Sequence, residues 1–219
     1  MLMINRGCES ESVFLRSGGI MPIKSPYQID IPATNILSYV FPDSEEPSDR
    51  PIWIDAEDAS NSLSPEQLLY WIRRLAVGLD NLGLKHGEAA MMVSMNHIFI
   101  PVLYLGLAGA KRVFTGGNPA YGVNELAYQL DNTGAEVIFV QPQFLDTVLK
   151  VAEKNGFPRD SIFLFDDEPC DCVNGIRDWR SMLGSEEQAA AWRWERMTAQ
   201  ESKNTMAVLN YSSGTTGLP

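Results

Sequence analysis

Helix and strand patterns alternate through the middle of the sequence, and this alternation restricts the fold more than any other feature. Apolar residues recur at helical spacing from Ser64 to Gly83, and a buried strand pattern follows at 89–95. The alternation continues, with predicted helices starting at Asn96 and covering 123–132 and 143–155, and predicted strands at 112–115, 135–141 and 161–165. The pattern predicts an α/β fold in which a parallel sheet carries helices on both faces. Such sheets bind ligands beyond the carboxyl ends of their strands.

Local signals support the predicted helix boundaries. Ser64, Pro65 and Gln67 combine an N-cap, a proline in the first helical turn and a capping-box glutamine. Asn96 is expected to cap the next helix, which is apolar on nearly every side and therefore internal. Gly134 is expected to end the helix at 123–132.

The flanking segments have weaker patterns. Residues 21–63 are rich in proline, serine and acidic residues, and we expect an extended segment with one or two short strands. Residues 166–203 are expected to form an acidic loop and a short helix at AAAWRWERM. Thr205–Tyr211 is predicted to be a strand that leads directly into the last residues of the sequence.

Composition and charge exclude several classes of protein. The net charge of −11 argues against nucleic-acid binding, which depends on clustered Lys and Arg. The longest apolar stretch, 89–110, is divided by Asn96 and His97, so we predict no membrane span. The three cysteines favour a reducing compartment, and free thiols are favoured over a zinc site at Cys170 and Cys172. We expect residues 1–20 to be a leader, with Met21 as the alternative start.

The sequence ends in an uncharged segment, SSGTTG, directly after a predicted strand. Glycines allow backbone N–H groups to point inward, and serine and threonine hydroxyls add donors, so the segment could hold a phosphate. A flexible polar tail has the same composition, and composition alone leaves both readings open. The segment is not a Walker A loop, because no Gly-Lys-Ser/Thr follows the glycines.

Three stretches together resemble the adenylate-forming enzymes, a family that includes acyl-CoA synthetases, 4-coumarate–CoA ligases, firefly luciferase and peptide-synthetase adenylation domains. YSSGTTGLP resembles the family's phosphate-loop signature, VFTGGNPAYGVNELAYQLDNTGAEVIF resembles its Asn-Pro turn, helix and strand, and LGLKHGE resembles the segment before its first core strand. The resemblance implies that residues 21–219 are the first part of the family's large N-terminal AMP-binding domain, ending in the phosphate loop.

The resemblance also implies a function. We expect an acid–CoA ligase that uses Mg-ATP to adenylate a small carboxylic acid (an aryl, phenylpropanoid or fatty acid) and then transfers the acyl group to CoA. The implied phosphate-binding residues are Ser212, Ser213, Gly214, Thr215, Thr216 and Gly217. No residue of this chain is assigned to catalysis or to a bound metal. The implied location is cytoplasmic or peroxisomal.

Other interpretations remain open beside this one. The family signature continues with Lys-Gly, and its acyl pocket and catalytic lysine lie further along, so we expect the 219-residue chain to be inactive by itself. The alternative is a truncated, non-catalytic product that binds nucleotide or a partner weakly. A dinucleotide-binding oxidoreductase is less favoured, because no G-x-G-x-x-G joins a strand to a helix.

Several polar or aromatic residues have a structural interpretation that we prefer to a functional one. We expect Lys111 and Arg112 to reach solvent at a helix end, and His97 to be a capping or core residue. For the acidic residues we favour a solvated loop over a cation site: Asp166, Asp167, Glu168 and Asp171. For the tryptophans we favour packing over a binding platform: Trp71, Trp179, Trp192 and Trp194.

Overall fold

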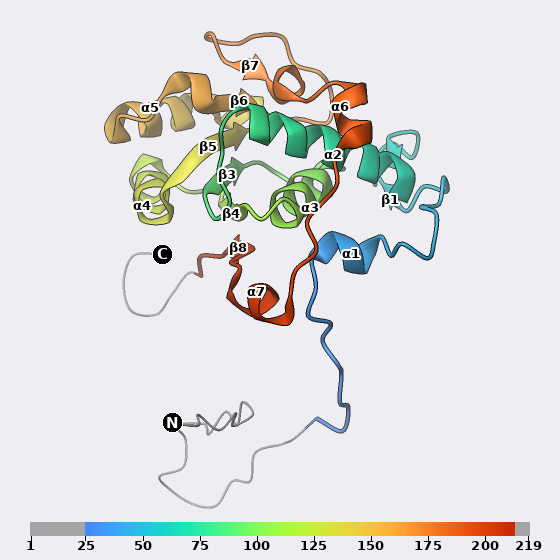
Figure 1. Ribbon diagram of the computed structural model, residues 1–219. Helices are drawn as coiled ribbons and strands as arrows, with labels where there is room; N and C mark the ends of the chain where they lie inside the picture. Colours follow the sequence, from blue (N-terminus) through green and yellow to red (C-terminus); the bar gives the residue numbers. More distant parts are fainter. Residues whose placement is uncertain (1–24, 213–219) are drawn as a thin grey trace, which may run out of the picture. The chain divides into compact units, whose positions relative to one another are not determined.

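The computed structural model describes residues 25–212, and it separates them into a short segment and one larger unit (Figure 1). Residues 25–32 are extended and exposed, and the backbone N–H of Tyr27 donates to Ser25 Oγ. Residues from Ala33 onward form the larger unit. The predicted leader at 1–20 lies outside the described residues.

A six-stranded sheet lies at the centre of the larger unit, and every neighbouring pair of its strands is parallel. The predicted parallel α/β fold is therefore confirmed. The strand order is β7-β6-β5-β3-β4-β8, with bounds β3 Ala89–Val93, β4 Val113–Gly117, β5 Ala135–Val140, β6 Ile162–Leu164, β7 Arg177–Asp178 and β8 Val208–Leu209. The chain runs from β3 outward to β4 and then returns past β3 to β5, so the direction of winding reverses between β3 and β5.

Helices cover both faces of this sheet. On one face, α2 (Pro65–Asn81) and α3 (Ile100–Gly109) pack on side chains that include Phe139 and Phe163. On the other face, α4 (Val123–Thr133) and α5 (Leu145–Asn155) pack on the alternate strand residues, among them Ile138 and Val140. Each inner strand is apolar at successive positions because neighbouring side chains enter different cores.

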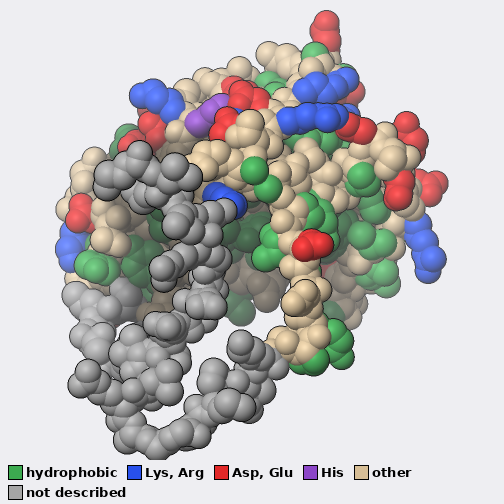
Figure 2. Space-filling view, turned by 60° about the horizontal axis from the view of Figure 1, so that its bottom comes forward, with side chains coloured by type: hydrophobic (Ala, Val, Ile, Leu, Met, Phe, Trp, Pro, Cys, Tyr) green, Lys and Arg blue, Asp and Glu red, His purple; other side chains and the backbone are tan. Residues whose placement is uncertain are grey.

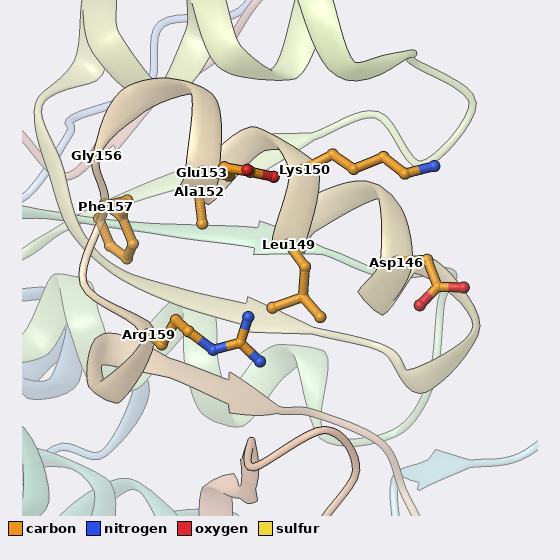
Figure 3. Close-up of a pocket in the computed structure, with 8 residues that line it drawn as sticks. All are labelled: Asp146, Leu149, Lys150, Ala152, Glu153, Gly156, Phe157 and Arg159. Atoms are coloured by element: carbon orange, nitrogen blue, oxygen red, sulfur yellow. The ribbon is translucent and has the colours of Figure 1, made fainter.

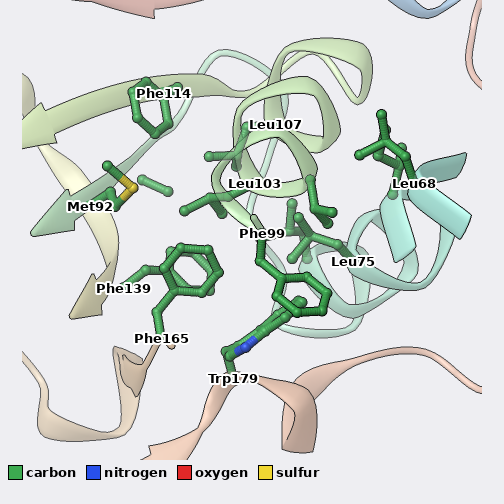
Figure 4. Packing of buried hydrophobic residues seen from close by; sticks show 14 of the residues in the cluster. Leu68, Leu75, Met92, Phe99, Leu103, Leu107, Phe114, Phe139, Phe165 and Trp179 are labelled. Carbon is green, nitrogen blue, oxygen red and sulfur yellow. The ribbon is translucent and has the colours of Figure 1, made fainter. Parts of the chain in front are cut away.

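An aromatic cluster closes the α2–α3 face at the end of the sheet (Figure 4). Trp179 is fully buried, and its ring centroid lies 5.5 Å from that of Phe99 and 5.3 Å from that of Phe165. Trp71 packs beside Trp179 at 5.7 Å. These tryptophans are core residues, as the sequence favours.

The predicted boundaries of α2 are confirmed, but those of α3 are partly wrong. Ser64 Oγ accepts from the N–H of Gln67, and the Gln67 side chain accepts from the N–H of Ser64. Asn96 does not cap α3, which begins after Phe99 without a side-chain cap. The chain after β3 is irregular for several residues, and the backbone N–H of Met95 there donates to Gln141 Oε1 in the loop after β5.

The flanking segments differ from the sequence expectation in two places. NILSYVF contains a short helix, α1 (Ile36–Val40), capped by Asn35, while two short strands, β1 (Trp53–Ile54) and β2 (Ser62–Leu63), form an antiparallel pair. The helix before the tryptophans is α6 (Glu186–Ala191), and Trp192 already has extended backbone angles. The AAAWRWERM helix prediction is therefore wrong beyond its alanines. A further helix, α7 (Ala199–Asn204), precedes β8.

The expectation that Lys111 and Arg112 reach solvent is wrong for Arg112, whereas Lys111 stays partly exposed. Arg112 is 5% exposed and donates to the carbonyl oxygens of Leu84 and Ala110 and to Asp80 Oδ1. The Lys111 side chain is 13% exposed, and its Nζ lies 2.5 Å from Glu195 Oε2. Arg112 can be buried because carbonyl and carboxylate acceptors lie close by, and the half-buried Lys111 pairs with the exposed Glu195 carboxylate.

Candidate phosphate-binding edge of the sheet

The segment that leads to the predicted phosphate loop is the edge strand β8. Its register places Val208 beside Phe114 and Leu209 beside Thr115, and the N–H of Phe114 donates to Ala207 O at 3.0 Å. Because β8 is parallel to β4, its carboxyl end lies at the same edge of the sheet as the carboxyl ends of the inner strands. The chain therefore brings residues 210–212 to the edge where parallel sheets bind ligands.

Ser212 is the one predicted loop residue inside the described range, and it is exposed at this edge. The other five predicted residues, Ser213, Gly214, Thr215, Thr216 and Gly217, lie outside the described residues. Their phosphate contacts stay a prediction.

The same edge holds the second motif of the sequence analysis. The two glycines of GGNPAYG are the last residues of β4, and in the turn that follows Asn118 Oδ1 accepts from the N–H of Ala120 at 2.9 Å. Strand pairing between β4 and β8 thus places the starts of two motifs, far apart in the sequence, side by side.

Four polar residues next to β8 were not singled out by the sequence. Thr115 on β4 and Gln129 on α4 are 0% and 1% exposed, and they bond to each other at 3.0 Å. The Tyr211 hydroxyl donates to Asn132 Oδ1 on α4. Partial burial raises the pKa of the Tyr211 phenol above its ordinary value. The sequence feature that could have indicated these residues is Gln129, a polar residue at a core-facing position of the helix, beside the buried Leu126 and Leu130.

A second polar group joins the loops after β3, β5 and β6, where the winding reverses. Gln141 Oε1 accepts from the N–H of Met95 at 3.0 Å, and Gln141 Nε2 donates to Asp166 Oδ1 at 3.1 Å. Asn61 Nδ2 donates to Asp167 Oδ2 at 2.9 Å. Both carboxylates are half-buried and accept hydrogen bonds from amide side chains, and the choice between a solvated loop and a cation site stays a prediction.

His97 belongs to this group. Its ring centroid lies 4.7 Å from that of Phe165, and its Nδ1 accepts from the N–H of Phe99 at 3.3 Å. Burial lowers the pKa of the imidazole to about 4, so the ring is neutral near pH 7. His97 therefore has the packing role that the sequence favours, but it does not cap α3, whose N-cap residue is Phe99.

Within residues 25–212, no group of three or more His, Cys, Asp or Glu side chains lies close enough together to hold a metal ion. Cys170 and Cys172 have free thiols. The helices of the same range include none with the length and apolar composition needed to cross a bilayer.

A pocket of about 750 Å³ lies on the outer side of α5, away from the β4–β8 edge (Figure 3). Leu149 and Arg159 face each other across it, whereas Lys150 and Asp146 point away. On the face of the molecule shown in Figure 2, Lys and Arg side chains lie next to Asp and Glu side chains. Neither the pocket nor this face is lined by charges of one sign alone.

Comparison with known proteins identifies the family of this chain. The model of the AMP-binding enzyme family matches residues 42–219, a range that contains the whole sheet and the segment after β8. The chain belongs to the AMP-binding enzyme family.

Relatives with known roles are CoA ligases. The chain is 35% identical to the acyl-CoA ligase azaF of Aspergillus niger over 194 residues, which are 87% of this chain and 36% of that protein. It is 34% identical to the phenylacetyl-CoA ligase epaB of Aspergillus niger over 194 residues, 87% of this chain and 35% of that protein. The chain thus spans about a third of the length of the curated relatives that it matches.

Solved structures of AMP-binding enzymes share the fold. The anthranilate CoA ligase AuaEII in complex with anthranoyl-AMP matches with a TM-score of 0.64 and 19% identity, covering 84% of this chain and 33% of that one. ATP-bound MatB from Rhodopseudomonas palustris matches with a TM-score of 0.63 and 22% identity, covering 86% of this chain and 34% of that one.

Proposed function

We propose that this chain supplies the ATP phosphate-binding part of an acid–CoA ligase. The observation that carries the proposal is the placement of Ser212 by a parallel edge strand at the carboxyl edge of the sheet, within the range that matches the AMP-binding enzymes. In the proposed reaction a carboxylate oxygen attacks the α-phosphorus of Mg-ATP and displaces pyrophosphate. The thiol sulfur of CoA then attacks the acyl carbon and displaces AMP.

The role of the loop is to hold the phosphates that become the leaving group. Backbone N–H groups and hydroxyls of Ser212–Gly217 would donate to the phosphate oxygens, where negative charge develops. The loop carries no cation of its own, so these donors and the magnesium ion that accompanies ATP would offset the charge. We assign no magnesium ligand among residues 25–212.

We propose an aryl, phenylpropanoid or fatty acid as the substrate. The names of the relatives support this range, since one is a phenylacetyl-CoA ligase and another, from Pinus taeda, is a 4-coumarate–CoA ligase, 27% identical over 213 residues, 93% of this chain and 36% of that protein. A cytoplasmic or peroxisomal location is proposed on the reduced cysteines and on the likeness to the peroxisomal OPC-8:0-CoA ligase 1 of Arabidopsis thaliana.

The test uses the natural-length protein that contains this chain. It is incubated with ATP, Mg²⁺, CoA and one acid at a time (phenylacetate, 4-coumarate, and medium- and long-chain fatty acids), and mass spectrometry follows the products. We expect AMP and one acyl-CoA, both absent when ATP is omitted. Folded protein that forms no thioester from any of these acids would contradict the proposal.

The 219-residue chain by itself is expected to form no acyl-AMP, since it spans about a third of the relatives' length. Acyl-AMP released by the purified 219-residue chain would contradict this expectation.

A further inference from the structure

The buried polar chain between α4 and β8 ends at the last residue of the strand that leads to the predicted loop. Gln129 Nε2 donates to Thr115 Oγ1 at 3.0 Å and to Gly116 O at 2.9 Å. Thr115 Oγ1 in turn donates to Leu209 O at 2.9 Å. Leu209 lies three positions before Ser212.

This chain of bonds is not required to fill the core. Thr115 is fully buried and Gln129 is 1% exposed, and apolar side chains surround them on α4, for example Leu126 and Leu130. Burying an amide and a hydroxyl costs free energy that their bonds only offset, so an apolar pair of the same shape would stabilise the core at least as well. The amide also keeps a buried oxygen, Oε1, which has no partner among residues 25–212.

Strand β8 needs such a constraint because its own pairing is short. It forms two residue pairs with β4, whereas β3 pairs with β4 over five. A second contact from α4 follows two residues later, where the Tyr211 hydroxyl donates to Asn132 Oδ1. Two side-chain contacts, one from Thr115 on β4 and one to Asn132 on α4, therefore fix the chain immediately before Ser212.

We propose that Thr115 and Gln129 are positioning residues that set the start of the phosphate loop, with Asn132 and Tyr211 as a second anchor. The proposal rests on the proposed function, since it assigns these residues a role in ATP binding. Binding of a triphosphate depends on donors held to within a fraction of an ångström, so a loose strand end would weaken ATP binding while leaving acid binding nearly unchanged.

The experiment compares two threonine-to-valine changes in the natural-length protein. Thr115→Val removes the hydroxyl that reaches Leu209 O. Thr133→Val is the matched control on α4, because Thr133 Oγ1 bonds only locally, to the carbonyl oxygens of Gln129 and Leu130. The readout is KM for ATP and KM for the acid in acid-dependent exchange of labelled pyrophosphate into ATP, with thermal unfolding of each variant.

We expect Thr115→Val to raise KM for ATP about tenfold, the effect of one lost hydrogen bond to a positioned group, with KM for the acid changed less than about twofold. Thr115→Ser, which keeps the hydroxyl, should restore KM for ATP, and Thr133→Val should leave it unchanged. Gln129→Met should raise KM for ATP as well, and the double variant with Thr115→Val should add little, because both break one chain of bonds.

Equal KM for ATP in Thr115→Val and Thr133→Val would overturn the proposal. If Thr115→Val does not fold, Tyr211→Phe carries the test, with Tyr104→Phe on α3 as its control: a KM for ATP that Tyr211→Phe leaves unchanged would then overturn it. Wild-type protein without acid-dependent exchange would instead contradict the proposed function, so the two failures are distinguishable.

Discussion

Arg112 shows how a single buried cation joins three parts of the chain. Its guanidinium donates to Leu84 O from Nε and Nη2, to Ala110 O and to Asp80 Oδ1. We predict that Arg112→Leu lowers the free energy of unfolding by about 3 kcal/mol, because two buried carbonyls lose their donors and the Asp80 carboxylate loses its cation. Urea unfolding measures the loss.

The conservative variant is the control for Arg112. Lysine keeps the charge but not the forked donors, so Arg112→Lys should recover only part of the loss. Equal stability of wild type and Arg112→Leu would contradict the assigned role.

His97 gives a prediction about pH. The unfolded imidazole takes up a proton near pH 6.5, but burial delays protonation in the folded protein to about pH 4. Between these values the unfolded state binds more protons, so stability is complete above pH 6.5 and is lost as pH falls toward 4. We expect this histidine to account for about 2 kcal/mol of that loss, allowing for partial solvent screening.

Unfolding of the wild type and of His97→Gln at pH 7 and pH 4.5 tests this. The variant should lose less stability across the interval, whereas His86→Gln, at an exposed position, should behave as the wild type does. Parallel losses in all three proteins would contradict the prediction.

Residue-level prediction from the sequence succeeded where the partners are local. The Ser64–Gln67 capping box spans three residues, and it is present. Two of the three partners of Arg112, Leu84 and Asp80, lie 28 and 32 positions away, so the sequence showed this cation without most of the acceptors that allow its burial.

At the scale of elements, a glycine fixes how closely the loop after β7 approaches α2. A Cβ on Gly78 would lie 2.4 Å from the backbone oxygen of Met182, so an alanine there forces two backbones apart. We predict that Gly78→Ala lowers the free energy of unfolding by about 2 kcal/mol, although alanine is the better helix former.

Gly106→Ala on α3 is the matched comparison for Gly78→Ala. Its Cβ would meet the end of the Leu75 side chain at 2.8 Å, and a methyl group can move. We expect a change within about 1 kcal/mol in thermal unfolding. A smaller loss for Gly78→Ala than for Gly106→Ala would contradict the assigned close contact.

Elements in which apolar residues recur at a regular spacing were predictable from the sequence, whereas short elements fixed by tertiary contacts were not. The strand at β5 and the helix ended by Gly134, which has φ 59°, follow from apolar spacing and a left-handed C-cap. The tryptophans after α6 have no such signal: Trp194 Nε1 donates to Ser38 Oγ at 2.9 Å, a contact between distant segments that keeps the chain extended there.

At the scale of the whole molecule, the sequence predicted a parallel sheet but not the order of its strands. The alternation of helices and strands determines the layers. The neighbours of β3 depend on which connection between strands crosses back over β3, and here it is the connection from β4 to β5. Pairing of β8 with β4 is the part of this order that matters for function, because it places the segment before Ser212 beside the turn after β4. Sequence resemblance proposes a role for the loop, and strand order places its first residue, Ser212, at the carboxyl edge of the sheet.

We propose that residues Ser212–Gly217 hold the phosphates of ATP during activation of an acid. The measurement that tests this is acid-dependent exchange of labelled pyrophosphate into ATP by the natural-length protein, compared with its Thr215→Val/Thr216→Val variant. We expect exchange that needs both the acid and ATP, and a loss of at least about tenfold in the variant. Exchange that the double variant leaves unchanged would contradict the claim.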